Sequence, residues 1–181
     1  VREFSKKDSR VRLISRIDRF GLSSAIKEGC LNASGDTIAV MDSDGQHEVR
    51  SLFAALDYIS NNNEDIVIGS RFLKKSSIEG LSKHRKDSST IANKIARLSL
   101  SNNYKNLTDY LSGFFVFKRN SCISYVKRID VNGFKFLYEL LAISKGKFKI
   151  LEIPLIFNER MHGNSKLDLP VVWDFLISLL H

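Results

Sequence analysis

Short apolar runs alternate along the chain with longer segments of helical periodicity, which is the pattern of an α/β domain with a parallel or mixed sheet. Buried strands are predicted where such a run lies between turn signals, at residues 11–14, 37–41, 65–69, 113–117 and 148–157. Helices are predicted at residues 22–33, 49–59, 90–100, 134–144 and 169–180. Residues 70–89 are basic and serine-rich and are predicted to form a long surface loop. Pro154 indicates an edge or a bend in the last strand.

The composition narrows the class of protein. The chain has 181 residues, 43% of them hydrophobic, which suits one folded domain. Its net charge of +8 leaves nucleic acid, an anionic membrane surface and phosphorylated small molecules as possible partners. No apolar run is long enough to span a bilayer, and Cys30 and Cys122 have no ligand or disulfide pattern. We therefore expect two ordinary buried thiols in a protein on the cytoplasmic side.

An acidic cluster follows the predicted strand at residues 37–41. Asp42 and Asp44 are separated by one residue, and Gln46 follows them. Ligands of open α/β sheets bind beyond the carboxyl ends of the strands, so the two carboxylates can meet one divalent cation there. Mg²⁺ or Mn²⁺ is the expected ion, with Gln46 as a third oxygen ligand. An ordinary acidic turn after a strand is the alternative interpretation.

Basic and glycine-flanked polar residues form three further candidates. Arg71 directly follows the predicted strand at 65–69, where its planar fork is suited to bind a phosphate through two hydrogen bonds. The lysines and arginines that follow it also fit a solvated loop face. Residues 109–114 and 160–166 place polar groups beside a glycine, where a backbone can approach a ligand closely.

Two other kinds of site are not supported. Residues 113–117 superficially match the aromatic strand of an RNA-recognition motif, but Ser112 stands where a basic residue is required. A buried strand explains these phenylalanines better, and we predict no nucleic-acid partner. The four histidines, His47 among them, have no metal-ligand or triad spacing and are predicted to be structural or on the surface.

Taken in order, the motifs resemble a family 2 glycosyltransferase of the dolichol-phosphate mannose synthase type. The matching stretches are residues 19–25, 40–47, 68–72, Arg85 with Ser89, 109–114 and 154–166. The resemblance implies a GT-A type, Rossmann-like α/β fold with a mixed, mostly parallel sheet flanked by helices. It places an N-terminally truncated catalytic domain at residues 1–168, because the nucleotide-binding segment that opens such domains has no counterpart here. Residues 169–181 are expected to form an apolar helix at the membrane interface, with a core helix as the alternative.

The resemblance also implies an activity and roles for residues. The implied reaction is the inverting transfer of mannose or glucose from GDP-mannose or UDP-glucose to a dolichyl or undecaprenyl phosphate at the cytoplasmic membrane face. Asp42, Asp44 and Arg71 would be catalytic, with Asp42, Asp44 and Gln46 as metal ligands. Arg71, Arg85 and Ser89 would receive the lipid phosphate. Substrate contacts would also come from Asp109, Ser112, Gly113, Arg160, Ser165 and Lys166.

The chemistry of the implied reaction agrees with the residues present. A sugar that leaves a diphosphate builds up negative charge, which a divalent cation stabilises. An acceptor phosphate, with a second pKa of about 6, is already anionic at neutral pH, so no catalytic histidine is needed. Two alternatives stay open: a catalytically impaired fragment that binds phosphates or membrane without turnover, and a family 2 enzyme with a polysaccharide acceptor.

Overall fold

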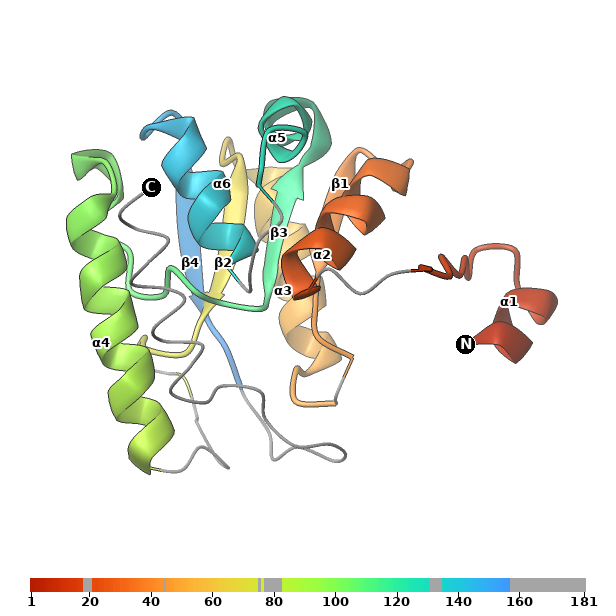
Figure 1. The fold of residues 1–181 in the computed structure, drawn as a ribbon, viewed down its shortest axis with the longest axis horizontal. Coiled ribbons are helices and arrows are strands. Elements are labelled where there is room, and N and C mark those ends of the chain that lie inside the picture. The colour runs from red at the N-terminus through yellow and green to blue at the C-terminus, as the bar shows by residue number, and fades with distance from the viewer. Residues whose placement is uncertain (18–20, 44, 75, 77–82, 131–134, 157–181) are drawn as a thin grey trace.

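The computed structural model describes residues 1–17, 21–43, 45–74, 76, 83–130 and 135–156, with the backbone alone at 83–89. The helices are α1 (Arg2–Lys7), α2 (Gly21–Asn32), α3 (Val49–Asn61), α4 (Lys83–Ser99), the short 3-10 helix η1 (Asn102–Tyr104), α5 (Arg119–Val126) and α6 (Phe136–Ser144). The strands are β1 (Thr37–Val40), β2 (Ile66–Ser70), β3 (Phe115–Lys118) and β4 (Ile150–Pro154). The predicted helix at 169–180 lies outside the described residues (Figure 1).

The four strands form one mixed sheet in the order β1-β3-β2-β4. β3 runs antiparallel to both β1 and β2, and β2 pairs in parallel with β4. The predicted mixed α/β class is confirmed, but the share of parallel pairs is smaller than predicted within the described strands. The reason is the path after α4, which returns the chain to the edge where β1 and β2 end, so that β3 starts there and runs back between them (Figure 1).

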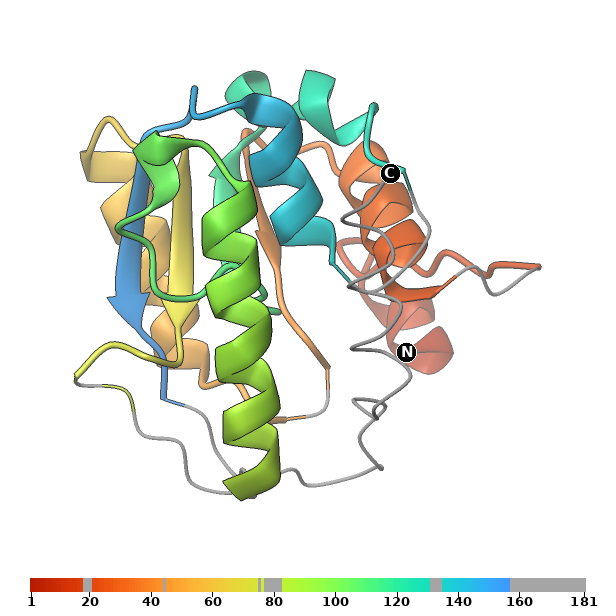
Figure 2. The same ribbon diagram turned by 60° about the vertical axis from the view of Figure 1, so that its left-hand side comes forward.

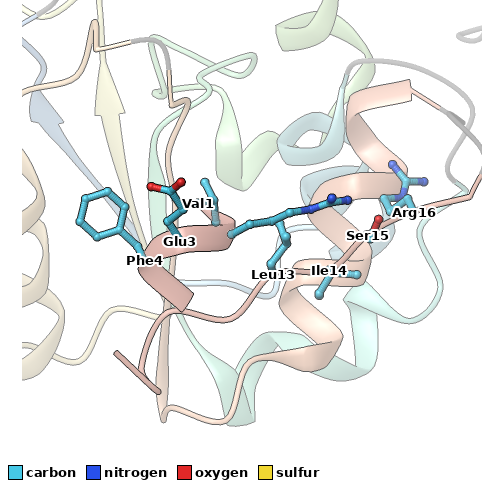
Figure 3. Close-up of a pocket in the computed structure, with 8 residues that line it drawn as sticks. Val1, Glu3, Phe4, Leu13, Ile14, Ser15 and Arg16 are labelled. Atoms are coloured by element: carbon cyan, nitrogen blue, oxygen red, sulfur yellow. The ribbon is translucent and has the colours of Figure 1, made fainter. Parts of the chain in front are cut away.

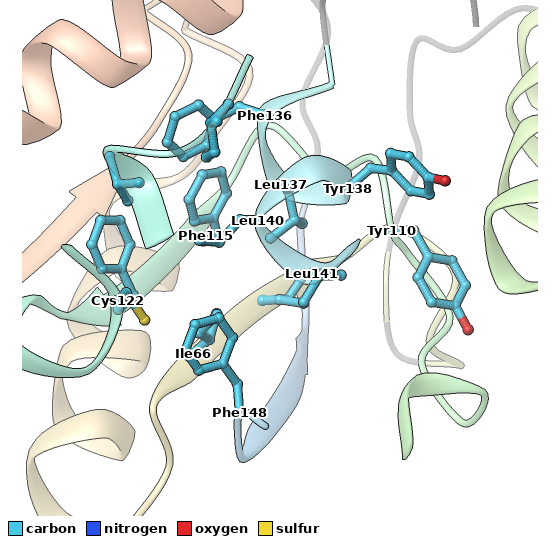
Figure 4. Packing of buried hydrophobic residues seen from close by; sticks show 14 of the residues in the cluster. Ile66, Tyr110, Phe115, Cys122, Phe136, Leu137, Tyr138, Leu140, Leu141 and Phe148 are labelled. Atoms are coloured by element: carbon cyan, nitrogen blue, oxygen red, sulfur yellow. The ribbon is translucent and has the colours of Figure 1, made fainter. Parts of the chain in front are cut away.

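Helices cover both faces of the sheet, as Figure 2 shows. Alternate residues of β3 point to opposite faces. Phe115 and Phe117 belong to the larger core, with residues of α2, α4, α5 and α6, whereas Val116 packs with Ala55 and Ile59 of α3. Figure 4 shows how α6 places Leu137, Leu140 and Leu141 over β2 and β3. Every residue of β2 is buried, which explains why the strand is apolar up to Ser70 at its end.

Two predictions of local structure are wrong. Residues 11–14 form no strand, because no neighbouring strand pairs with them and Leu13 and Ile14 stay exposed. The predicted loop at 70–89 is too long at its end, since α4 begins at Lys83. The start of α4 is polar and lacks an apolar stripe, so periodicity did not indicate it. The sequence also gave no sign of α5, whose buried residues are only Cys122 and Val126.

The two cysteines are free and buried, as predicted. Burial raises the pKa of the Cys30 thiol to about 12 and also raises that of Cys122. Both thiols are therefore protonated and unreactive near neutral pH. Among the described helices, none combines the length and the apolar character that crossing a bilayer requires.

Candidate functional site

The carboxyl ends of β1 and β2 meet the amino end of β3 at one edge of the sheet, the lower edge in Figure 1. Asp42 comes shortly after β1, Arg71 directly after β2, and residues 109–113 lead into β3. The antiparallel direction of β3 therefore brings together three motifs that lie far apart in the sequence. This edge is the expected place for a ligand in an open α/β sheet.

Asp42 lies directly against Gly113. A Cβ atom added to Gly113 would stand 2.6 Å from Oδ2 of Asp42, which is too close for two non-bonded atoms. The side chain of Asp42 is 41% exposed, so its carboxylate is open to a ligand. Glycine is needed at position 113 to leave room for this carboxylate.

His47 is an ionisable residue that lies next to Asp42. Its Nε2 atom lies 3.7 Å from Oδ2 of Asp42, its side chain is only 2% exposed, and its ring packs against Phe114 with centroids 5.6 Å apart. Burial agrees with the prediction of a structural histidine. The contact with Asp42 was not predicted, because the histidines have neither metal-ligand nor triad spacing in the sequence.

Arg71 and Asp109 form a close ion pair. Nε and Nη2 of Arg71 donate to the two carboxylate oxygens of Asp109 at 2.7 and 2.8 Å, and the backbone N–H of Arg71 donates to Asp109 at 3.2 Å. Asp109 is completely buried. Burial acts against the charge of Arg71, but Asp109, together with Asp42, raises the pKa of its guanidinium. The fork that was predicted to bind a phosphate thus holds Asp109 with Nε and Nη2, and no hydrogen bond of Nη1 is found within the described residues.

Glu152 of β4 is a residue of this region that sequence reasoning missed. Its carboxylate accepts hydrogen bonds from the backbone N–H groups of Thr108 and Asp109 and from the Thr108 hydroxyl, at 2.8 to 3.0 Å. Burial raises the pKa of Glu152 and the charge of Asp109 adds to this, while the hydrogen bonds oppose the rise. A charged residue inside the apolar run at 150–155 was the signal that could have indicated it.

Ser112 holds the turn before β3 in place. Its hydroxyl is buried, donates to the carbonyl of Gly69 at 2.6 Å and accepts the N–H of Phe114 at 3.1 Å. These contacts join the turn to the end of β2. The hydroxyl of Ser112 is therefore engaged by the backbone in this structure.

Several predicted site residues cannot be placed as side chains. Arg85 and Ser89 fall in the first half of α4, where the backbone alone is described. Asp44, Arg160, Ser165 and Lys166 lie outside the described residues. Gln46 is described and buried. The structure thus brings together Asp42, Arg71, Asp109, Ser112 and Gly113 of the predicted set.

Asp42 is a side chain of this edge that fits a divalent cation. Its carboxylate is exposed beside a glycine whose missing side chain leaves space, and oxygen is the ligand atom that Mg²⁺ and Mn²⁺ prefer. Within the described parts of the chain, no three His, Cys, Asp or Glu side chains gather into a complete metal site. Asp42 is therefore suited to supply one ligand.

A surface hollow of about 580 Å³ lies elsewhere, between α1 and the segment that precedes α2 (Figure 3). It is lined by Val1, Arg2, Glu3, Phe4, Leu13, Ile14, Ser15 and Arg16. None of the predicted site residues lines it. The chemistry-bearing residues lie at the sheet edge, so we take that edge and not this hollow as the candidate site.

The chain is similar to three curated glycosyltransferases. It is 36% identical over 169 residues to a dolichol-phosphate mannosyltransferase of Pyrococcus furiosus, covering 92% of this chain and 46% of that protein. A dolichol-phosphate mannosyltransferase of Mycosarcoma maydis is 34% identical, with coverages of 94% and 56%. A dolichyl-phosphate beta-glucosyltransferase of Trichomonas vaginalis is 32% identical, with coverages of 93% and 52%. The chain thus spans about half the length of these relatives.

Solved structures share the fold. Glucosyl-3-phosphoglycerate synthase from Mycobacterium tuberculosis superposes with a TM-score of 0.58 at 19% identity, covering 89% of this chain and 56% of that one. Mannosyl-3-phosphoglycerate synthase from Rubrobacter xylanophilus gives a TM-score of 0.58 at 13% identity, with coverages of 90% and 50%. These neighbours confirm the predicted GT-A type α/β fold. The sequence pattern of glycosyl transferase family 2 matches residues 1–126, and the chain belongs to that family.

Proposed function

We propose that this chain carries the catalytic edge of an inverting glycosyltransferase that moves a hexose from a nucleotide sugar to a polyprenyl phosphate. The observation that carries the proposal is the meeting of Asp42, Arg71 and the 109–113 turn at one sheet edge. The three relatives support it, since each is named for a transfer to dolichyl phosphate. Mannose and glucose are the candidate sugars.

Asp42 is the proposed first ligand of a divalent metal ion, with Asp44 and Gln46 as the others. Such an ion would stabilise the negative charge that develops on a departing diphosphate. The fold neighbour from Mycobacterium tuberculosis supports this class of ion, because it has been solved in complex with Mn²⁺ and UDP-glucose. In this chain, Gly113 leaves the space in which the Asp42 carboxylate stands.

Arg71 is the proposed partner of the acceptor phosphate. Its guanidinium keeps Nε and Nη2 on Asp109 and can offer Nη1 to an anion at the same edge. The ion pair holds the planar group in a fixed orientation, so little entropy is lost when a phosphate binds. Arg85 and Ser89 would join it, and Arg160, Ser165 and Lys166 would close over the phosphates. We place the reaction at the cytoplasmic face of a membrane, where a lipid acceptor is presented.

A transfer assay tests the proposal. The chain is incubated with radiolabelled GDP-mannose or UDP-glucose, MnCl₂ and a short-chain polyprenyl phosphate, and label is counted in the organic phase. We expect label in the lipid for one of the two donors, and a fall of about 100-fold or more for Asp42→Asn. Asp57→Asn on α3 is the matched control, because Asp57 is exposed and, among the described residues, accepts a hydrogen bond from Asn61 of its own helix alone.

Three outcomes would contradict the proposal. Label that appears in an added polysaccharide and not in the lipid would show that the acceptor is a polysaccharide. Calorimetric binding of the nucleotide sugar and Mn²⁺ without any transfer would indicate a binding fragment. A product with retained anomeric configuration, read by NMR, would overturn the inverting stereochemistry.

A further inference from the structure

Glu152 is connected to Arg71 by a short hydrogen-bonded path through Asp109. Oε1 of Glu152 accepts the backbone N–H of Asp109 at 2.9 Å. The side chain of Asp109 in turn accepts Nε and Nη2 of Arg71 and, at 3.3 Å, the N–H of Leu111. Glu152 therefore fixes the backbone from which Asp109 reaches the guanidinium.

A second path runs through hydroxyl groups. The Thr108 hydroxyl donates to Oε2 of Glu152 at 3.0 Å, so in its 2.6 Å contact with Ser70 it must accept the proton of the Ser70 hydroxyl. The oxygen of Ser70 accepts the N–H of Phe72 at 3.1 Å. This path ends at Phe72, the residue after Arg71. In the Arg71–Asp109 pair, the backbone of Asp109 and the backbone next to Arg71 are therefore both connected to Glu152.

The arrangement suits a carboxylate better than a neutral polar side chain. Three donors approach the two oxygens of Glu152: the Thr108 N–H is shared by Oε1 and Oε2, the Asp109 N–H donates to Oε1, and the Thr108 hydroxyl donates to Oε2. A glutamine has a single acceptor oxygen: with its NH₂ group at the Oε1 position it leaves the Asp109 N–H unpaired, and with its NH₂ group at the Oε2 position it lies against the Thr108 N–H and forces the Thr108 hydroxyl to accept and to donate to Ser70 instead. An apolar residue would leave all three donors unpaired.

We propose that Glu152 is a positioning residue for the transfer reaction, which holds the guanidinium of Arg71 at the site edge through Asp109 and Thr108. This inference rests on the proposed role of Arg71 in binding the acceptor phosphate. Glu152 itself touches no substrate in this scheme. Through these contacts, Glu152 fixes the direction of Nη1 of Arg71 while Nε and Nη2 donate to Asp109.

Kinetics of Glu152→Gln test the proposal. We expect kcat/KM for the polyprenyl phosphate to fall about 100-fold, because a displacement of about 1 Å in a positioning group has an effect of this size. In an Arg71→Lys background, which lacks the oriented fork, the same substitution should lower kcat/KM by less than about 3-fold further. A merely structural loss would lower the rate equally in both backgrounds. Asp57→Asn is again the matched control.

If Glu152→Gln folds poorly, Thr108→Val provides a second test of the proposal. It removes the hydroxyl path and leaves both backbone N–H groups on Glu152. We expect a fall of about 10-fold in kcat/KM, with the unfolding midpoint measured for every variant.

A measurement that does not depend on transfer activity separates this inference from the proposed function. The ¹H–¹⁵N signal of Arg71 Nε, assigned by its loss in Arg71→Lys, should exchange slowly with solvent because it is bonded to Asp109. We expect at least about 10-fold faster exchange in Glu152→Gln and no change in Asp57→Asn. Faster exchange without any lipid transfer would overturn the proposed function alone. Unchanged exchange in Glu152→Gln, or equal rate losses in the wild-type and Arg71→Lys backgrounds, would overturn the role of Glu152.

Discussion

Glu152 on β4 and Glu139 at the start of α6 are both half-buried glutamates, yet their surroundings differ. Each oxygen of Glu152 accepts two hydrogen bonds from the turn at Thr108 and Asp109. Oε2 of Glu139 is buried and has no hydrogen-bond partner within the described structure. Several N–H and O–H donors from one turn stabilise the charge of a half-buried carboxylate. Burial without such donors destabilises the charged form.

The difference appears in the way the two groups titrate. Burial, with the nearby charge of Asp130, raises the pKa of Glu139 to about 7, although Lys135 and Lys27 act in the opposite direction. For Glu152, the hydrogen bonds from Asp109 and Thr108 oppose the effect of burial. The carboxylate of Glu152 is therefore held by hydrogen-bond donors, whereas Oε2 of Glu139 has none among the described residues. Substitutions in the two regions should have opposite effects on stability.

The largest expected effect is the loss of Asp109. Asp109→Ala removes the partner of a mostly buried guanidinium, whose side chain is 14% exposed, and should lower the free energy of unfolding by about 4 kcal/mol. Urea denaturation followed by circular dichroism measures it. Asp109→Asn, which keeps one oxygen acceptor, should fall between wild type and alanine. An alanine variant as stable as Asp57→Asn would show that the paired-charge description of the edge is wrong.

A substitution at Gly113 tests how closely the edge is packed around Asp42. Gly113→Ala places a Cβ atom 2.6 Å from Oδ2 of Asp42, so this carboxylate must move from its position. We expect about a 100-fold loss in the lipid transfer assay with little change in the unfolding midpoint, because the side chain that moves is partly exposed.

Gly29→Ala is the matched control for Gly113→Ala. An added Cβ at Gly29 meets nothing within 4 Å in α2, and alanine should stabilise the helix by about 0.5–1 kcal/mol while transfer stays unchanged. Equal activity of the two alanine variants would remove Asp42 from the proposed site.

Glu139 should behave in the opposite way to Asp109. A glutamate with a raised pKa in the folded state contributes most to stability below its unfolded pKa, near 4.5, and this contribution is lost as the pH rises through about 7. We therefore expect Glu139→Gln to stabilise the protein by about 2 kcal/mol at pH 8 and by almost nothing at pH 4. Urea denaturation at both pH values measures it. A variant that is less stable than wild type at pH 8 would mean that the ionised carboxylate is well solvated.

The sequence predicted those parts of the fold that have strong local signals. The apolar runs of β1, β2, β3 and β4 lie between turn residues, and the predicted strands match them to within a few residues. The direction of β3 was not predicted, because it depends on the route of the chain after α4 and not on any residue in the strand. α5 was missed because only two of its eight residues are buried.

The site was partly predictable for a related reason. Asp42, Arg71 and Asp109 follow or precede strands, so their motifs could be recognised one by one. The pairing of Arg71 with Asp109 and the support from Glu152 could not be predicted, since they join residues 38 and 43 positions apart. Such contacts follow from the order of the strands in the sheet.

The smallest effect concerns Ser112, which was predicted from the family resemblance to bind substrate. Its hydroxyl is occupied by the carbonyl of Gly69 and the N–H of Phe114, so we expect Ser112→Ala to lower stability by about 1 kcal/mol. Because the backbone of Gly113 stays in place, KM for the acceptor should be unchanged within about 2-fold. A large rise in KM with unchanged stability would mean that the hydroxyl leaves the backbone to bind the substrate. The sheet edge would then rearrange when it binds its ligand, and the contrast with α6 would hold for the free protein only.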